Sequence, residues 1–163
     1  MSYTCHTCGM RHDELPDIGA DLPDPVLAIP EAERATRVKR TEETCIVDDE
    51  HYFIRGVILI PLRGREDHFG FGVWVTQKKE HFETYVAEPD TDTIGPFFGW
   101  LSNSLHFYTP DTFCLKTRAH FRGNGLRPSI ELEPTDHPLA VDQREGITLE
   151  KAWEIVHHAG VAR

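Results

Sequence analysis

Long apolar runs and a leader segment are both absent from this sequence of 163 residues. No stretch approaches the roughly 20 apolar residues that cross a bilayer, and residues 1–5 show neither the basic nor the apolar region of a signal peptide. We therefore expect a cytoplasmic protein with no membrane partner. The length fits a single domain, residues 1–163, with a hydrophobic core of its own.

Positive charge is scarce. The chain has 17 Lys and Arg against 27 Asp and Glu, which gives a formal net charge of −10. A surface this acidic repels phosphate backbones and anionic membranes. The densest basic segment, residues 34–40, has glutamates on both sides that weaken its field. The charge therefore disfavours nucleic acid as a partner, and a protein partner would carry a basic surface.

Several catalytic signatures are missing as well. The sequence contains no Gly-rich phosphate loop, no Gly-x-Ser-x-Gly elbow and no His-Glu-x-x-His segment. The enzyme classes built on those motifs are excluded, which favours a binding or regulatory protein over an enzyme.

Strand-forming residues concentrate in the middle of the chain. Residues 45–47, 52–61 and 69–75 are rich in β-branched and aromatic side chains, and short polar turns separate them. A second hairpin is predicted from residues 113–121 and 129–133, with a Gly-Asn-Gly turn between them. The sequence thus predicts an antiparallel sheet whose core spans residues 44–133.

A few helices are expected to flank this sheet, which makes the fold α+β. Apolar residues at helical spacing predict helices over residues 76–87 and 148–160, the second beginning at the N-cap Thr148. A shorter helix is expected within residues 31–40.

Two segments read as irregular. Residues 13–30 hold four prolines and predict an ordered wrap without regular structure, and residues 91–110 predict an aromatic loop that caps the core. We expect Trp74, in an alternating strand, and Trp100, in this loop, to be largely buried.

The sharpest chemical signal is the pair Cys5-x-x-Cys8. Two thiolates separated by two residues on a tight turn bind one Zn²⁺ at tetrahedral angles, and a reducing compartment favours a metal over a disulfide. His12 would supply a third ligand from the same loop, and Cys45 a fourth if the N-terminal segment docks on the first strand. We expect a structural zinc in a knuckle of residues 1–12, because four protein ligands leave no position for an activated water.

Other interpretations of the cysteines stay open. Cys114 and His6 are further candidate ligands. The pair would also suit redox chemistry, although no strand precedes it and no helix clearly follows to lower a thiol pKa. A third interpretation is free, partly buried thiols.

A second group of candidate residues follows the second hairpin. A carboxylate at Asp142 would orient His137 as a general base, and Arg127 would add a cationic group for a small anionic substrate. In the alternative interpretation, His137 fixes a turn by hydrogen bonding to backbone groups. Arg55 lies within an apolar strand, where alternation directs its side chain to solvent unless a cavity with a carboxylate receives it.

Short motifs are spread along nearly the whole chain. They are Cys5-x-x-Cys8-Gly9-x-x-His12, Leu15-Pro16, Cys45, Phe53-Ile54-Arg55-Gly56, Gly72-Val73-Trp74-Val75, Phe98-Gly99-Trp100-Leu101, Arg127-Pro128 with Glu131, His137-Pro138-Leu139-Ala140, Gln143 and Gly146-Ile147-Thr148. Together these motifs resemble one bacterial family, catalogued as domain of unknown function 2199. The resemblance implies no established catalytic residues.

The sequence therefore predicts a zinc-containing protein-binding or regulatory module. Three other functions stay open. They are an enzyme acting on a small anionic substrate through His137, Asp142 and Arg127, an immunity-type protein that neutralises a basic toxin, and a nucleic-acid binder that combines the knuckle with Arg11 and residues 34–40.

Overall fold

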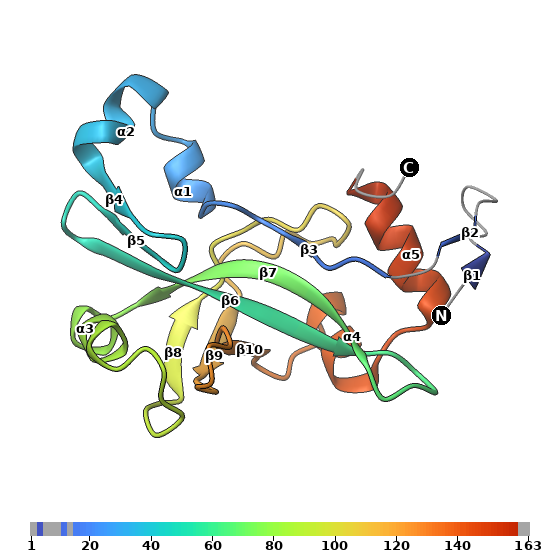
Figure 1. Cartoon of the computed structure of the whole chain (residues 1–163). Coiled ribbons are helices and arrows are strands. Elements are labelled where there is room, and N and C mark those ends of the chain that lie inside the picture. The colour runs from blue at the N-terminus through green and yellow to red at the C-terminus, as the bar shows by residue number, and fades with distance from the viewer. Residues whose placement is uncertain (1–2, 5–10, 13–14, 160–163) are drawn as a thin grey trace.

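The structure, a computed structural model, describes residues 3–4, 11–12 and 15–159 (Figure 1). The elements in this part of the chain are β1 (Tyr3–Thr4), β2 (Arg11–His12), β3 (Ile18–Gly19), α1 (Asp24–Leu27), α2 (Glu31–Arg37), β4 (Val38–Arg40), β5 (Thr44–Val47), β6 (His51–Pro61), β7 (His68–Gln77), α3 (Lys79–Ala87), β8 (Phe97–Trp100), β9 (Lys116–His120), β10 (Ser129–Leu132), α4 (Pro138–Glu145) and α5 (Leu149–His158).

A long antiparallel hairpin of β6 and β7 forms the centre of the molecule, as the sequence predicts. It pairs from Pro61 with His68 at the turn to Tyr52 with Gln77 at the far end. Every second residue of β6 from Ile54 to Ile60 is buried, because successive side chains of a strand point to opposite faces. This hairpin runs across the whole molecule and carries the other elements on both sides (Figure 1).

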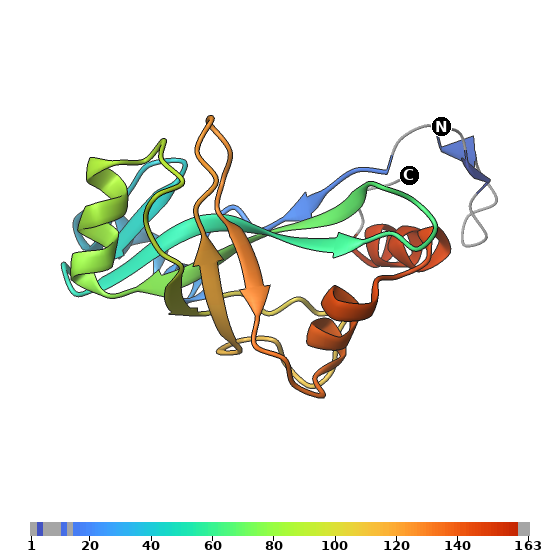
Figure 2. The ribbon, with the colours of Figure 1, turned by 90° about the horizontal axis from the view of Figure 1, so that it is seen from below.

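The fold is α+β, but the expectation of a purely antiparallel sheet is wrong. The main sheet has the strand order β3-β7-β6-β10-β9-β8, with β5 also paired to β6, and two of its pairings are parallel. One parallel pairing joins β10 to β6 only at Ser129 and Val57, because β10 crosses β6 steeply (Figure 2). Alternation in a sequence identifies a strand but not its direction or its neighbour.

The far edge of the sheet curls back toward its centre. Leu101 pairs with Val75 of β7, and Ser102 N donates to Trp74 O at 2.8 Å. Gly99 is required at this closure, since a Cβ there would collide with Thr76 O. The segment after β8 therefore completes the edge of β7 beyond β3.

Both segments expected to be irregular contain regular structure. Residues 13–30 include β3 and α1, and β3 packs so closely on β7 that a Cβ on Gly19 would lie 3.1 Å from Gly72 Cα. The aromatic segment of residues 91–110 contains the strand β8. Helix α4 was not expected either.

The remaining helices agree with their predictions. Helix α2 lies within residues 31–40, α3 within residues 76–87, and α5 begins after Thr148, whose hydroxyl accepts a hydrogen bond from Lys151 N at 3.1 Å. None of the helices in the described part of the chain is long and apolar enough to span a bilayer.

The core divides into two clusters. The larger one joins the β6–β7 hairpin to α3, α4 and α5, and the smaller one lies under α1 and contains Cys45, Phe53 and Trp74. Trp74 is 1% exposed, which confirms its predicted burial. Trp100 is 41% exposed, so the expectation for this residue is wrong.

Candidate functional site

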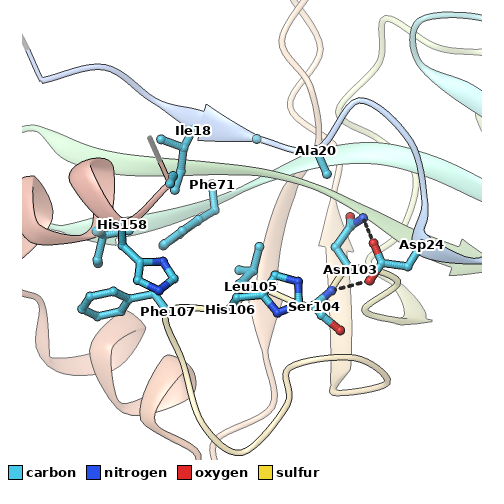
Figure 3. A pocket seen from close by; sticks show the side chains of 13 residues that line it. Ile18, Ala20, Asp24, Phe71, Asn103, Ser104, Leu105, His106, Phe107 and His158 are labelled. Atoms are coloured by element: carbon cyan, nitrogen blue, oxygen red, sulfur yellow. Dashed lines mark hydrogen bonds between the residues drawn. The ribbon is translucent and has the colours of Figure 1, made fainter. Parts of the chain in front are cut away.

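A cavity of about 380 Å³, here called the β3–α5 pocket, opens between four distant parts of the chain (Figure 3). Strand β3 forms one wall, Phe71 of β7 the floor, residues 103–107 the opposite wall, and the end of α5 closes one side. Its volume lies in the range of about 300–1,000 Å³ that is typical of small-ligand sites. The pocket is therefore large enough for a small molecule.

The polar wall of the pocket is built on Asp24, the first residue of α1. One carboxylate oxygen accepts a hydrogen bond from Ser104 N at 2.7 Å, and the other accepts one from Asn103 Nδ2 at 3.1 Å (Figure 3). Asn103 is 1% exposed, and its Oδ1 accepts from Trp74 N at 2.8 Å. The buried amide thus fixes the carboxylate relative to the centre of the sheet.

Two imidazoles lie at the exposed rim of this pocket. His158 packs edge-on against Phe107 with ring centroids 5.6 Å apart, and His106 lies next to Ser104 (Figure 3). The Ser104 hydroxyl donates to Asp111 Oδ1 at 2.7 Å. Because this hydroxyl is bonded to a carboxylate rather than to an imidazole, the wall does not form the serine–histidine pair of a nucleophilic enzyme.

A second feature is the Trp100 surface, which we define as Phe98, Trp100 and Phe113. Their side chains are 40%, 41% and 38% exposed. The rings of Phe98 and Trp100 meet edge-on at 5.1 Å, although one residue separates them along β8, and Lys116 Nζ lies 6.0 Å from the Trp100 ring centre. Large aromatic side chains gathered at half exposure are typical of interaction surfaces.

Trp100 stands between two hollows. One, of about 460 Å³, is lined mainly by apolar groups that include Pro25, Phe53 and Phe113. The other, of about 300 Å³, is lined by residues that include Leu115 and Glu133. The exposed residue Cys114 borders both hollows and has a positive φ of 68°, which turns the chain sharply at this point.

His137 caps helix α4, and both of its ring nitrogens bond to backbone groups. Its Nδ1 accepts from Leu139 N at 3.0 Å, and its Nε2 donates to Pro110 O at 2.8 Å. The accepting role of Nδ1 places the proton on Nε2, so both ring nitrogens are occupied by backbone groups. The geometry matches the interpretation in which His137 fixes the backbone.

Asp142 belongs to a buried junction between α4, α5 and the loop after β8. Its Oδ2 accepts a hydrogen bond from the Tyr108 hydroxyl at 2.8 Å and lies 2.7 Å from Lys151 Nζ. Burial, together with this bond to the carboxylate, raises the pKa of Tyr108. Both Tyr108 and Asp142 are less than a tenth exposed, and the junction holds the two helices on the sheet.

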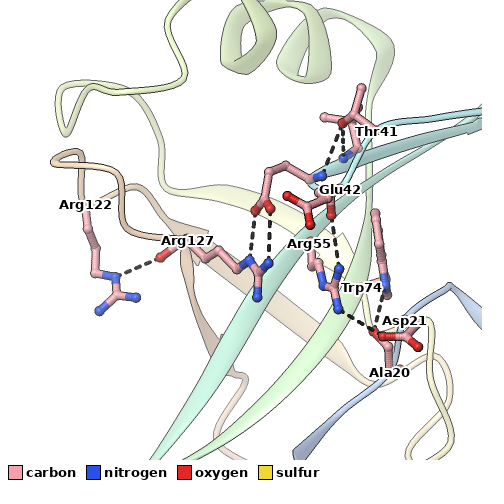
Figure 4. A network of polar contacts seen from close by, with 10 residues as sticks. Ala20, Asp21, Thr41, Glu42, Arg55, Trp74, Arg122 and Arg127 are labelled. Carbon is pink, nitrogen blue, oxygen red and sulfur yellow. Dashed lines mark hydrogen bonds and ion pairs between the residues drawn. The ribbon is translucent and has the colours of Figure 1, made fainter. Parts of the chain in front are cut away.

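Arg127, in the loop before β10, forms a separate ion pair with Glu43, the residue before β5. Its guanidinium donates two hydrogen bonds to Glu43, at 2.9 and 3.1 Å, which raises the pKa of Arg127 (Figure 4). In the described part of the chain, no hydrogen bond or ion pair joins Arg127, His137 and Asp142 to one another. The catalytic interpretation of these three residues gains no support from their contacts.

Arg55 is less exposed than alternation alone suggests. Its side chain is 17% exposed, its guanidinium lies 5.6 Å from the Trp74 ring centre, and one of its nitrogens donates to Glu42 O at 3.2 Å (Figure 4). A second nitrogen lies 3.5 Å from Asp21 Oδ1. These contacts could not be predicted from the sequence, because residues 21 and 42 belong to other segments that the fold brings next to β6.

The predicted zinc ligands fall into two groups. Cys5 and Cys8, with the expected knuckle, lie outside the described residues, as does the reserve candidate His6, and for His12 the structure describes the backbone strand. Strand β2, which contains His12, lies beside α5, whereas β5, which contains Cys45, lies at the opposite end of the molecule (Figures 1 and 2).

Cys45 is unsuited to the role of fourth ligand. It is 0% exposed in the smaller core cluster, and burial raises the pKa of its thiol to about 11, which disfavours the thiolate that zinc needs. The described part of the chain contains no group of three or more His, Cys, Asp and Glu side chains placed to hold a metal. Cys114 lies far along the chain, at the Trp100 surface.

The comparison with known families matches nearly the whole described structure. The profile of a family described as an uncharacterized protein conserved in bacteria (DUF2199) covers residues 4–147. The chain belongs to this family. The match confirms the resemblance read from the motifs, and it includes β8, α4 and both hollows beside Trp100. No curated protein and no solved structure matches the chain.

Proposed function

We propose that this bacterial protein is a protein-binding module that docks a basic partner on the Trp100 surface. The observation that carries the proposal is a set of three partly exposed aromatic side chains, of which Trp100 lines both hollows and Phe113 the larger one. Aromatic anchors next to pockets supply most of the binding energy in many protein interfaces. A partner would place apolar side chains in the hollows on either side of Trp100.

Docking through side chains fits this surface better than addition of a strand. Strand β8 pairs with β9 on one edge, and on the other edge Trp100 N donates to Thr76 Oγ1 at 2.9 Å and Gln77 Nε2 donates to Phe98 O at 3.2 Å. The backbone groups of β8 are therefore engaged on both sides. Recognition depends on the exposed rings and the hollows.

The charges around the surface favour a basic partner. Glu133 lines the smaller hollow. His51 lines the larger one and follows Glu50, whereas Asp48 and Asp49 of the same turn are already paired with Arg37 and Lys39. Lys116 Nζ lies 6.0 Å from the Trp100 ring centre, so this ring already holds a cation of the protein itself. Glu133 and the net charge of −10 attract a segment that combines cationic and large apolar side chains. A basic toxin, as an immunity-type protein would bind, is one partner of this kind.

We also propose that Cys5 and Cys8 bind a structural zinc, with His12 as a third ligand. This proposal is supported by the two-residue spacing of the cysteines, which suits tetrahedral coordination. It is also supported by the position of His12, which lies in β2 four residues after Cys8. Such a site would brace the segment beside α5, away from the Trp100 surface. The metal would then have no direct part in docking.

Selection of peptides from a random displayed library tests the docking proposal. We expect the protein to enrich sequences with Lys or Arg beside a large aromatic or aliphatic residue. A representative enriched peptide should bind the Trp100→Ala variant at least about tenfold more weakly than the wild type, which corresponds to about 1.4 kcal/mol.

The matched control is Val86→Ala, since Val86 is also an exposed apolar residue, at 52%, but lies on α3 away from the hollows. This variant should bind the peptide as the wild type does. Peptides without basic residues, or equal binding by Trp100→Ala and the wild type, would contradict the proposal.

A further inference from the structure

The hydrogen-bond donors on the wall of the β3–α5 pocket are already used within the protein. Asn103 Nδ2 donates to Leu22 O at 2.9 Å and to Asp24 at 3.1 Å. The Ser104 N–H donates to Asp24, and the Ser104 hydroxyl donates to Asp111. The amide of Asn103 and both donors of Ser104 are therefore not left for a ligand.

Acceptors, in contrast, remain available. Each carboxylate oxygen of Asp24 accepts one hydrogen bond from the protein and has capacity for another. At the rim, a neutral imidazole of His106 or His158 offers one ring nitrogen as a further acceptor and the other as a donor. The carboxylate at the wall is thus matched by a ligand that donates.

The charge of the pocket also favours a ligand that donates hydrogen bonds and carries a positive charge. Asp24 is an acid, and no Lys or Arg is among the described residues that line the cavity. A phosphate or carboxylate would meet a fixed negative charge without a permanent cation to pair with. The remaining lining is apolar and aromatic, with Phe71, Ile155 and Phe107 around the bottom and side.

From this accounting we infer that the β3–α5 pocket binds a small molecule that carries a protonated amine on an apolar body. The ammonium group, with three donors and no acceptor, pairs with Asp24. The apolar body covers Phe71 and Ile155. This site is distinct from the Trp100 surface and requires neither a protein partner nor zinc.

Protein-observed NMR with two matched probes tests the inference. The probes are 2-phenylethylamine and 3-phenylpropionate, which share a ring and a short chain but carry opposite charges. We expect the amine to bind with a Kd of about 1 mM, as its few atoms allow, and to shift the backbone amide signals of residues 103–107. The carboxylate should leave those signals unchanged.

Three variants localise the binding. Asp24→Asn removes the charge and should weaken the amine at least about tenfold, and Ala20→Leu should block the cavity while leaving the Asp24 contacts in place. Asp21→Asn is the control, because Asp21 is 97% exposed and does not line the pocket. The inference is overturned if both probes bind equally, if the amine does not bind, or if folded Ala20→Leu protein binds it as the wild type does.

Discussion

The β3–α5 pocket and the Trp100 surface differ in how their shape is maintained. The pocket wall is a chain of hydrogen bonds from Trp74 through Asn103 to Asp24, all fixed by a buried amide. The Trp100 surface is a set of partly exposed rings, two of which meet edge-on. The first arrangement orients a small ligand, whereas the second accommodates side chains of varied shape.

One loop nevertheless connects the two regions. The carboxylate of Asp111 accepts hydrogen bonds from the Ser104 hydroxyl, which belongs to the pocket, and from Phe113 N, which belongs to the Trp100 surface. The segment from β8 to β9 therefore contributes to both regions. Substitutions in this segment therefore show whether each region depends on buried contacts or on exposed side chains.

The largest effect should follow from removing the buried amide. Asn103→Ala leaves the Trp74 N–H and the Leu22 carbonyl without partners, so we expect the free energy of unfolding to fall by about 2–4 kcal/mol. Trp100→Ala, at a half-exposed position, should change it by less than about 1 kcal/mol. Urea unfolding of both variants makes the comparison, and equal losses of stability would remove the distinction between the two regions.

Cysteine substitutions should give an intermediate effect and test the metal separately. Cys45→Ser places a hydroxyl in an apolar cluster and should cost about 1–3 kcal/mol of stability without changing the zinc content. Cys5→Ser should lower the zinc content from about one ion per chain without unfolding the sheet. Metal analysis of protein purified with reduced thiols gives the answer. A loss of zinc in Cys45→Ser protein, together with an unchanged zinc content in Cys5→Ser protein, would reverse this assignment.

The smallest effect concerns Asp111. Hydrogen bonds from Phe113 N and the Ser104 hydroxyl hold its pKa below the usual range. A pKa lowered in the folded state stabilises the protein above the unfolded value of about 3.9, and this contribution is lost as the pH falls through the folded pKa. The stability difference between the wild type and Asp111→Asn should therefore be present at neutral pH and shrink in acid. A difference of the same size at both pH values would show that the charge of Asp111 has no part in it.

Sequence patterns were sufficient for the elements whose signal is local. The β6–β7 hairpin, the β9–β10 hairpin and the cap of α5 at Thr148 all follow from alternation, turn residues and capping. The parallel pairings of β3 and β10 depend on long connections that carry no such local signal. Strand β8 was not predicted because Gly95-Pro96 precedes it and Gly99 lies within its four residues, and these residue types are typical of turns.

The site residues also divide into those with a local sequence signal and those whose role depends on distant segments. The capping role of His137 was among the interpretations because a His before a Pro has a local meaning. The roles of Asp24, Asn103 and the exposed ring of Trp100 come from contacts between segments far apart in the chain. The alternation of Phe98 and Trp100 around Gly99 was the available signal, since it fits a strand with two aromatic side chains on one face.

Titration calorimetry of two variants with two ligands tests the central claim, that the docking surface and the pocket are separate sites. The ligands are a selected basic peptide and 2-phenylethylamine, and the variants are Trp100→Ala and Asp24→Asn. We expect Trp100→Ala to weaken the peptide at least about tenfold and leave the amine unchanged, and Asp24→Asn to do the reverse. Peptide binding that survives Trp100→Ala but is lost in folded Asp24→Asn protein would contradict the account.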